Sequence, residues 1–412
     1  MNKKHLTMTL LLLCLLVNTV AAQHGRRFAD PVFGNVTVSK KIRYSEAIRI
    51  GDSSPTSLYF DFYEPANDTL SARPMVITVF GGSFVVGYRD YKDMVEYCTR
   101  LAKHGYVAAS IDYRLLYLWQ LNTTSIVRDG YMAAQDISSA VRYFKAHCDE
   151  YRIDTSNIYL LGNSAGSVGI LAEMFMGEDE RPEATLTLPD LGTMHSSGFA
   201  EYANYSPKVA GAIPQWGGVI DLNTIDQDEY APLCMIHGTS DGVIPIDSGY
   251  CFSVFSSSAL PYLYGSRAIA AHLDKIGIEN YEFHCFEHEG HSFYLTDNLE
   301  HKIIPEKFNA CFNIVRDFLL RCQGYPITID DNPSKITIYP NPATDAITID
   351  DTNYSQGEPY QINIFDVNGR EIFSKTITET YLVINISHWK SGVYLIQFEQ
   401  DGKCQNKKFI KQ

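Results

Sequence analysis

Short apolar runs alternate with helical stretches over most of this chain, and this alternation limits the possible folds more than any other feature. Residues 75–80 and 106–111 are mostly apolar and rich in β-formers, as strands buried on both faces are. Residues 128–148 instead have helical periodicity. Further strands are expected at 58–63, 158–161, 209–213, 233–237 and 281–286, and further helices after Ser164, at 266–276 and at 305–320. This alternation predicts an α/β domain with a mostly parallel sheet flanked by helices.

Two segments of this region differ from the rest. Residues 58–63 alternate apolar and polar side chains and predict a half-exposed strand. Residues 177–207 are polar and interrupt the alternation, so we expect a surface excursion there, either a lid or an ordinary loop.

The composition is typical of a folded chain with more than one domain. The 412 residues are 45% apolar and 20% charged, which excludes wholesale disorder and a multi-span membrane protein. Asp and Glu outnumber Lys and Arg by 48 to 34, for a formal net charge of −14. Because an acidic surface repels phosphate backbones, we expect no nucleic-acid partner.

The N-terminus has the pattern of a secretory signal peptide over residues 1–22. Lys3 and Lys4 precede an apolar run at 8–17, and small residues follow at 20–22. A transmembrane anchor is the alternative, but the run is short for about 30 Å of hydrocarbon. Cleavage would leave eight of the nine cysteines, whose pairing the sequence does not specify.

The character of the chain changes after Cys322. Residues 323–334 are rich in Gly, Pro, Asp and Asn and predict a linker between the α/β domain at 23–322 and a β-sandwich at 335–412. Within the sandwich, Asn368-Gly369 and Asp401-Gly402 each separate two strand-like runs, which is the signal of a hairpin.

The motif Gly162-Asn163-Ser164-Ala165-Gly166 fits G-x-S-x-G between a predicted strand and a predicted helix. A serine on such a turn is exposed as a nucleophile, and the free N–H groups of the following helix point at developing negative charge. Ser164 is therefore the candidate nucleophile; the alternative is a Gly/Ser-rich loop. The run Phe80-Gly81-Gly82-Ser83-Phe84 follows another buried strand. We expect the amides of Gly82, Ser83 and Ala165 to form an oxyanion hole.

A serine nucleophile needs a base and an acid that orients the base, here expected in the chain order Ser, Asp, His. Asp241 follows strand 233–237 and His291 follows strand 281–286, where the sites of open parallel sheets gather. His288 is the rival base and Asp247 the rival acid, while His237 and His284 are expected to be core histidines. Because no H-E-x-x-H motif or further ligand cluster is visible, we expect no metal and no cofactor.

These motifs together resemble the α/β-hydrolase superfamily, in its secreted carboxylesterase/lipase branch. The resemblance covers residues 40–322 and includes Asp112-Tyr113-Arg114-Leu115. It implies an α/β-hydrolase fold and hydrolysis of carboxylic esters through an acyl-enzyme on Ser164, Asp241 and His291. The chain departs from the family pattern at Phe80 and Ser83, which replace a His and a Gly, and at Asn163, where an acid is frequent.

Residues 335–412 resemble the C-terminal sorting domain of type IX secretion substrates. The motifs are Ile338-Tyr339-Pro340-Asn341-Pro342-Ala343, the 364–370 run, Ser391-Gly392-Val393-Tyr394 and the basic end 407–411. The resemblance implies export across an outer membrane, with the type IX machinery as partner and a secreted or cell-surface location. A carbohydrate-binding sandwich is the alternative for this domain. For the whole chain, the alternatives to a carboxylesterase are a carbohydrate esterase removing acetyl or feruloyl groups and a non-catalytic surface binding protein.

Overall fold

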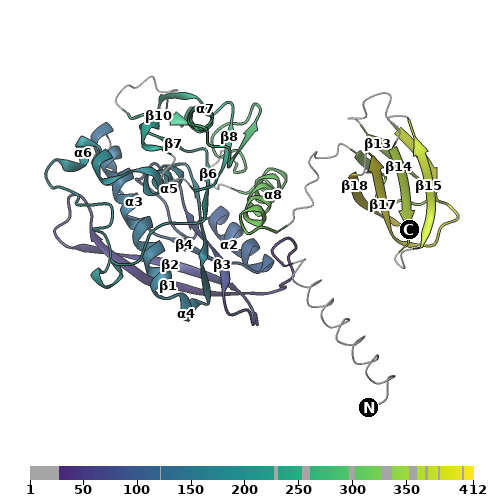
Figure 1. Ribbon diagram of the computed structural model, residues 1–412, viewed down its shortest axis with the longest axis horizontal. Helices are drawn as coiled ribbons and strands as arrows, with labels where there is room; N and C mark the ends of the chain where they lie inside the picture. The colour runs from purple at the N-terminus through teal and green to yellow at the C-terminus, as the bar shows by residue number, and fades with distance from the viewer. Residues whose placement is uncertain are drawn as a thin grey trace, which may run out of the picture. The chain divides into compact units, whose positions relative to one another are not determined.

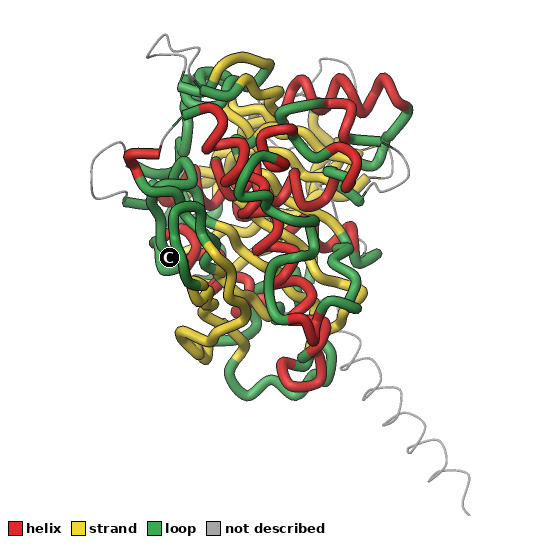
Figure 2. Tube along the Cα trace, turned by 90° about the vertical axis from the view of Figure 1, so that its left-hand side faces the viewer, coloured by secondary structure: helices red, strands yellow, loops and turns green. Residues whose placement is uncertain are grey.

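The computed structural model describes residues 27–120, 122–226, 231–252, 260–296, 302–325, 336–351, 360–366, 370–378, 381–400 and 403–412. The chain forms two compact units, residues 1–326 and 327–412 (Figure 1). Helices and strands share the first unit (Figures 1 and 2), and the second contains strands and turns (Figure 1). The predicted signal peptide and most of the predicted linker lie outside the described residues, as do the turns at 368–369 and 401–402.

An eight-stranded sheet organises the first unit. The β1–β2 and β2–β4 pairs are antiparallel, and every following pair is parallel. In sheet order, the strands are β1 (Val36–Ile48), β2 (Pro55–Pro65), β4 (Val107–Ile111), β3 (Arg73–Val79), β5 (Ile153–Asn163), β6 (Gly211–Gln215), β8 (Leu233–Gly238) and β11 (Tyr281–Phe286). The predicted α/β class with a mostly parallel sheet is confirmed.

Helices cover both faces of this sheet, as Figure 1 shows. On one side α3 (Thr123–Ala146) packs along α5 (Ala165–Phe175). On the other, α2 (Lys92–His104) meets α8 (Pro305–Cys322), where the rings of Tyr97 and Phe308 lie 4.5 Å apart. Since strands β3, β5, β8 and β11 are parallel, the loops after their carboxyl ends meet at one edge of the sheet.

The smaller elements complete the unit. A second sheet has the order β7 (Gly218–Val219), β10 (Tyr262–Gly265) and β9 (Ser248–Tyr250), and α7 (Ser266–Ile276) follows β10 directly. The short helices are α4 (Cys148–Tyr151) and α6 (Glu183–Leu186). Helix α6 lies within the 177–207 excursion, which is held to α3 by hydrogen bonds from Arg128 to the carbonyls of Ala184, Thr187 and Pro189.

The expectation of a half-exposed strand at 58–63 is wrong. Strand β2 lies between β1 and β4, and Phe60, Asp61 and Phe62 are all buried. The polar position is tolerated inside because the Asp61 carboxylate accepts a hydrogen bond from the Arg89 guanidinium at 2.8 Å and another from the amide of Lys41. An alternating sequence therefore marks an interior strand here, because one buried ion pair satisfies its acid.

Two further elements, β1 and α2, were not predicted. Strand β1 is largely exposed, so it lacks the apolar alternation that identifies a strand. Helix α2 does carry a recognisable signal, because Met94, Cys98 and Leu101 are buried and recur at helical spacing.

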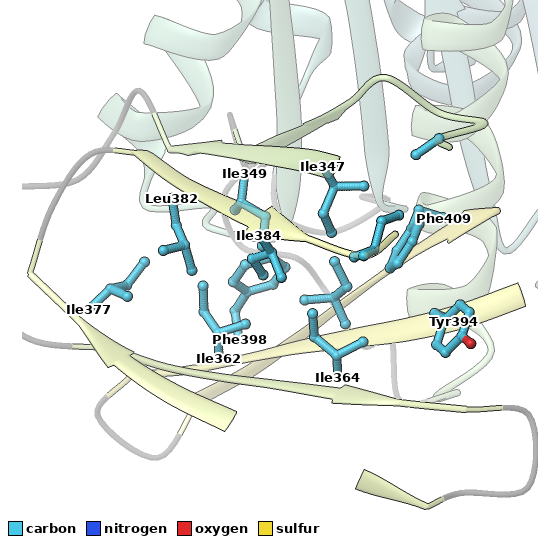
Figure 3. Close-up of a cluster of buried hydrophobic side chains, with 13 residues drawn as sticks. Ile347, Ile349, Ile362, Ile364, Ile377, Leu382, Ile384, Tyr394, Phe398 and Phe409 are labelled. Atoms are coloured by element: carbon cyan, nitrogen blue, oxygen red, sulfur yellow. The ribbon is translucent and has the colours of Figure 1, made fainter. Parts of the chain in front are cut away.

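The second unit is a β-sandwich. One sheet has the order β12 (Ile336–Tyr339), β13 (Ala346–Asp351) and β16 (Tyr381–Asn385), and the other has the order β15 (Glu371–Ile377), β14 (Tyr360–Phe365), β17 (Gly392–Gln400) and β18 (Lys403–Lys411). Side chains from both sheets form one core, which includes Ile347, Ile384, Ile362 and Phe398 (Figure 3). Trp389, an aromatic residue that could stack on a sugar if the domain bound carbohydrate, packs against this core.

The described cysteines are free thiols: Cys98, Cys148, Cys234, Cys251, Cys285, Cys311 and Cys322. The side chain of Cys404 lies outside the described part. Among the helices of the described ranges, none combines the length and the apolar character needed to cross a membrane.

Candidate active site

Ser164 lies on the tight turn between β5 and α5. Its φ of 52° and ψ of −121° are values that non-glycine residues rarely adopt. The turn closes because Gly166 has no side chain: a Cβ there would lie 2.2 Å from the Val79 carbonyl oxygen of β3. The Ser164 amide donates to the Gln215 carbonyl of β6 at 3.0 Å, which fixes the turn against the neighbouring strand.

The loops after β8 and β11 bring an acid and an imidazole to this serine. His291 Nε2 lies 2.8 Å from Ser164 Oγ, and His291 Nδ1 lies 2.8 Å from Asp241 Oδ2. The imidazole thus bridges a hydroxyl and a carboxylate from two other loops. In this arrangement Nδ1–H donates to the carboxylate and Nε2 can accept the hydroxyl proton.

Asp241 is buried and accepts several hydrogen bonds. Its Oδ1 accepts from the amides of Val243 and Ile244, and its Oδ2 faces His291 and, at 3.2 Å, His237 Nε2. Burial alone would raise the pKa of Asp241, but the hydrogen bonds and charges of the two histidines hold that pKa below its ordinary value. The carboxylate therefore remains ionised beside His291.

His237 has a position that sequence reasoning missed. It is fully buried, as expected of a core histidine, and its ring also contacts the acid that orients His291. Its Nδ1 lies 2.8 Å from Ser266 Oγ and its Nε2 lies 3.0 Å from the Ile244 carbonyl. The available signal was its place at the end of β8, four residues before Asp241.

The rival residues lie elsewhere. His288 is exposed, with a φ of 63°, and its amide donates to Thr239 Oγ1. Asp247 forms a surface ion pair with Arg267 at 2.9 Å. The expectation that His284 is a core histidine is wrong: it lies on the edge strand β11 with its side chain 34% exposed and paired with Glu282.

Glu282, His284 and Cys234 form the one group of possible metal ligands in the described part of the chain, with ligand atoms within 4.8 Å of one another. The Arg321 guanidinium already binds both carboxylate oxygens of Glu282. Because that positive charge occupies the carboxylate, an ion pair describes this group better than a cation site.

The loop after β3 has an unusual backbone beside Ser164. Gly82 has a φ of 132°, and a Cβ there would lie 1.8 Å from the Val86 carbonyl oxygen. Ser83 follows with a φ of 55°. Phe80, at the position of the family histidine, is buried and stacks on Tyr113, whose hydroxyl donates to the Phe80 carbonyl at 3.0 Å. An aromatic pair therefore supports the loop.

The amides expected to form an oxyanion hole are near the nucleophile. Gly82, Ser83 and Ser164 line a common hollow. Within the described residues, the Gly82 and Ser83 amides donate no backbone hydrogen bond. Ala165 is the first residue of α5, so its N–H has no intrahelical acceptor. These three amides are therefore the candidates for binding a ligand at Ser164.

Two hollows meet at Ser164, and both are lined by Ser83. The first is almost wholly apolar, with walls from α3, α5 and the β7–β10 region that include Val127, Leu171, Val219 and Leu263. The second is more polar and is lined by His291, Asn163, Tyr91 and Leu295. Of the two, only the second is lined by the imidazole.

Comparison with known proteins finds two families in separate parts of the chain. Residues 60–231 match the BD-FAE family, and residues 337–412 match the secretion system C-terminal sorting domain. Curated relatives include a probable isoprenylcysteine alpha-carbonyl methylesterase of Arabidopsis thaliana, 32% identical over 26% of this chain and 20% of the relative. Another is the fumonisin B1 esterase of Sphingopyxis macrogoltabida, 27% identical over 40% of this chain and 31% of the relative.

The chain spans between 20% and 55% of the length of the curated relatives it matches. Among solved structures, Thermogutta terrifontis esterase 2 phosphorylated by paraoxon aligns with a TM-score of 0.47 and 20% identity, over 72% of this chain and 96% of that one. The sheet order, the turn at Ser164 and the two family matches lead to one assignment. The chain joins an α/β-hydrolase domain, whose residues 60–231 match the BD-FAE family, to a C-terminal domain that matches the secretion system C-terminal sorting domain.

Proposed function

We propose that this protein is an exported serine hydrolase that cleaves carboxylic esters through an acyl-enzyme. The observation that carries the proposal is the unbroken hydrogen-bond chain Ser164–His291–Asp241, with 2.8 Å at each step. The match to an esterase-type family and the amides beside Ser164 support the same chemistry.

The proposed reaction has two halves. Ser164 Oγ attacks the ester carbonyl while its proton moves to His291 Nε2, and the amides of Gly82, Ser83 and Ala165 stabilise the oxyanion. The oxyanion collapses, the carbon–oxygen bond to the alcohol breaks, and His291 returns the proton to that alcohol. Water then attacks the acyl-enzyme with His291 again as base, which releases the acid and restores Ser164.

The two hollows suggest where each half of the ester binds. The departing alcohol must lie beside His291 to receive its proton, and His291 lines the second hollow. The acyl group would then bind in the apolar hollow.

A carbohydrate esterase is the second candidate, because export favours polymeric or foreign substrates. A non-catalytic binding protein would have no need of an intact hydrogen-bonded triad.

A panel of 4-nitrophenyl esters from acetate to palmitate tests the proposal. We expect kcat/KM to rise about tenfold from acetate to butyrate, since each buried methylene contributes about 0.8 kcal/mol. Acetylated xylan and methyl ferulate, assayed beside the panel, test the second candidate. If no ester in either set is hydrolysed, the proposed function is wrong.

We further propose that residues 1–22 direct export and that residues 335–412 engage the type IX machinery, which would place the enzyme outside the cell or on its surface. The sorting-domain match at 337–412 supports this. The sandwich also has a hydrophobic core of its own. The proposed catalytic groups all lie between Gly82 and His291.

A chain ending at Tyr325 should therefore keep kcat within about twofold of the full chain, since domains with separate cores fold independently. In the native host, the same truncation should accumulate inside the cell envelope. The measurements are turnover of the purified truncated protein and immunoblots of cell fractions. Lost turnover would make the sandwich part of the enzyme, and unchanged secretion would refute its sorting role.

A further inference from the structure

A buried carboxylate lies behind the nucleophile turn and has no part in the mechanism above. Asp93 stands in the first turn of α2 and is 3% exposed. Its Oδ2 accepts a hydrogen bond of 2.7 Å from Asn163 Nδ2, and Asn163 directly precedes Ser164. The same oxygen accepts from the Tyr294 hydroxyl at 3.3 Å. Tyr294 is three residues after His291.

One carboxylate oxygen thus joins the nucleophile turn to the histidine loop. The connection extends to β6, because the Tyr294 hydroxyl also lies 3.0 Å from Gln215 Oε1, and Gln215 Nε2 donates to Tyr97 at 2.8 Å. The backbone carbonyl of Gln215 also accepts a hydrogen bond from the Ser164 amide. The network therefore reaches Ser164 from two sides.

Asn163 also meets the proposed oxyanion loop. Its Oδ1 is buried with no hydrogen-bond partner among the described residues. A Cβ on Gly81 would lie 2.8 Å from this oxygen and 2.9 Å from Ser164 Cβ. Gly81 directly precedes Gly82, so a rotation of the Asn163 side chain would disturb a proposed oxyanion donor as well as the nucleophile. The hydrogen bond to Asp93 prevents that rotation.

The Asp93 side chain is the carboxyl group of this network. Burial raises the pKa of Asp93, while hydrogen bonds from the amides of Asp93 and Met94 and from Tyr294 and Asn163 act in the opposite direction. The charge of an ionised Asp93 raises the pKa values of Tyr91, Tyr97, Cys98 and Tyr294. These four side chains are neutral at pH 7, so none of them would compensate a second carboxyl group placed here.

We propose that Asp93 is a positioning residue for ester hydrolysis: paired with Asn163, it holds Ser164 and His291 in mutual register from one buried oxygen. This inference rests on the proposed function. The amide of Asn163 lies beside the nucleophile and the carboxyl group of Asp93 lies on α2. Exchanging the two residues should therefore preserve activity, whereas changing either one alone should lower it.

Four proteins test the proposal: the unchanged chain, Asp93→Asn, Asn163→Asp and the exchange of both residues. Asp93→Asn puts two amides face to face and weakens the hold on Asn163. We expect kcat to fall about 10- to 100-fold with little change in KM, because a misplacement of about 1 Å can cost that much. Asn163→Asp puts two carboxyl groups in contact, and they must share a proton.

The pH profile gives a readout that a merely structural role would not move. For Asn163→Asp, kcat should fall as the pH rises through the upper pKa of the carboxyl pair, in a range where the unchanged protein keeps its activity. The double exchange restores one carboxyl and one amide. Its kcat should be at least about tenfold higher than the product of the two single losses predicts, because the effects of substitutions at contacting residues are not additive. The added pH dependence should also disappear.

Glu96→Gln is the matched control, because it makes the same chemical change on the same helix at a surface pair with Arg100. It should leave kcat and the pH profile unchanged. Melting temperatures identify any variant that fails to fold. If one of the two single variants does not fold, the kcat of the exchange variant still decides the question. Losses that simply multiply in the exchange variant, or single variants that keep full kcat, overturn the proposal. If the unchanged protein hydrolyses no ester, the proposed function has failed instead.

Discussion

Replacing Ser164 by Ala should lower kcat by roughly 10⁵- to 10⁶-fold, to the detection limit of a nitrophenyl ester assay. The expected loss is this large because this hydroxyl is the group that the turn after β5 presents to His291 Nε2, at 2.8 Å. Without it no acyl-enzyme forms, and the oxyanion donors and substrate hollows alone provide a small residual acceleration.

The fold should survive the change. The Ser164 side chain hydrogen-bonds His291, whereas the hydrogen bond from the backbone amide of residue 164 to the Gln215 carbonyl is retained in the alanine variant. The melting temperature and the far-ultraviolet circular dichroism should therefore match those of the unchanged protein. Ser206→Ala, at an exposed serine, is the matched control and should keep full activity. Substantial ester hydrolysis by a clean Ser164→Ala preparation would rule out the proposed nucleophile.

His291→Ala should be nearly as damaging, with kcat reduced about 10⁵-fold or more, because groups of a triad act as a unit. Its removal takes the proton acceptor from Ser164 and leaves the buried Asp241 carboxylate with one imidazole fewer. Both steps of the proposed reaction need that imidazole, so acylation and deacylation should fail together.

His288→Ala is the matched control for this histidine. His288 is exposed, and its backbone amide donates a hydrogen bond to Thr239 Oγ1, which alanine would retain. We expect kcat within about twofold of the unchanged protein, as for most surface substitutions. Steady-state kinetics of both variants at saturating ester decide the matter. A large loss in His288→Ala with activity kept in His291→Ala would show that the wrong base was chosen.

Local patterns were sufficient to predict the fold class. Apolar content identified β3, β4, β5, β6 and β8, because buried parallel strands are apolar on both faces whatever their neighbours are. The strand β1 was not predictable in this way, since it is mostly exposed, and the burial of Asp61 in β2 depends on Arg89 from a distant loop. Patterns along the chain indicate which faces of an element are apolar, but they do not indicate which side chains of other elements will pack against or pair with that element.

The candidate site divides in the same way. The sequence by itself determined Ser164, Asp241 and His291 as candidates, because a strand-to-helix turn and two strand ends have local signatures. Only the tertiary structure decided that the His291 ring reaches Ser164, while His288 has a positive φ in the same loop and an exposed side chain. It also decided that His237 contacts Asp241 and that Asp93 holds Asn163. The contacts of His291 with Ser164 and of Asp93 with Asn163 join residues far apart in the chain, so their physical cause is the packing of the sheet and its helices, and no spacing along the chain predicts them.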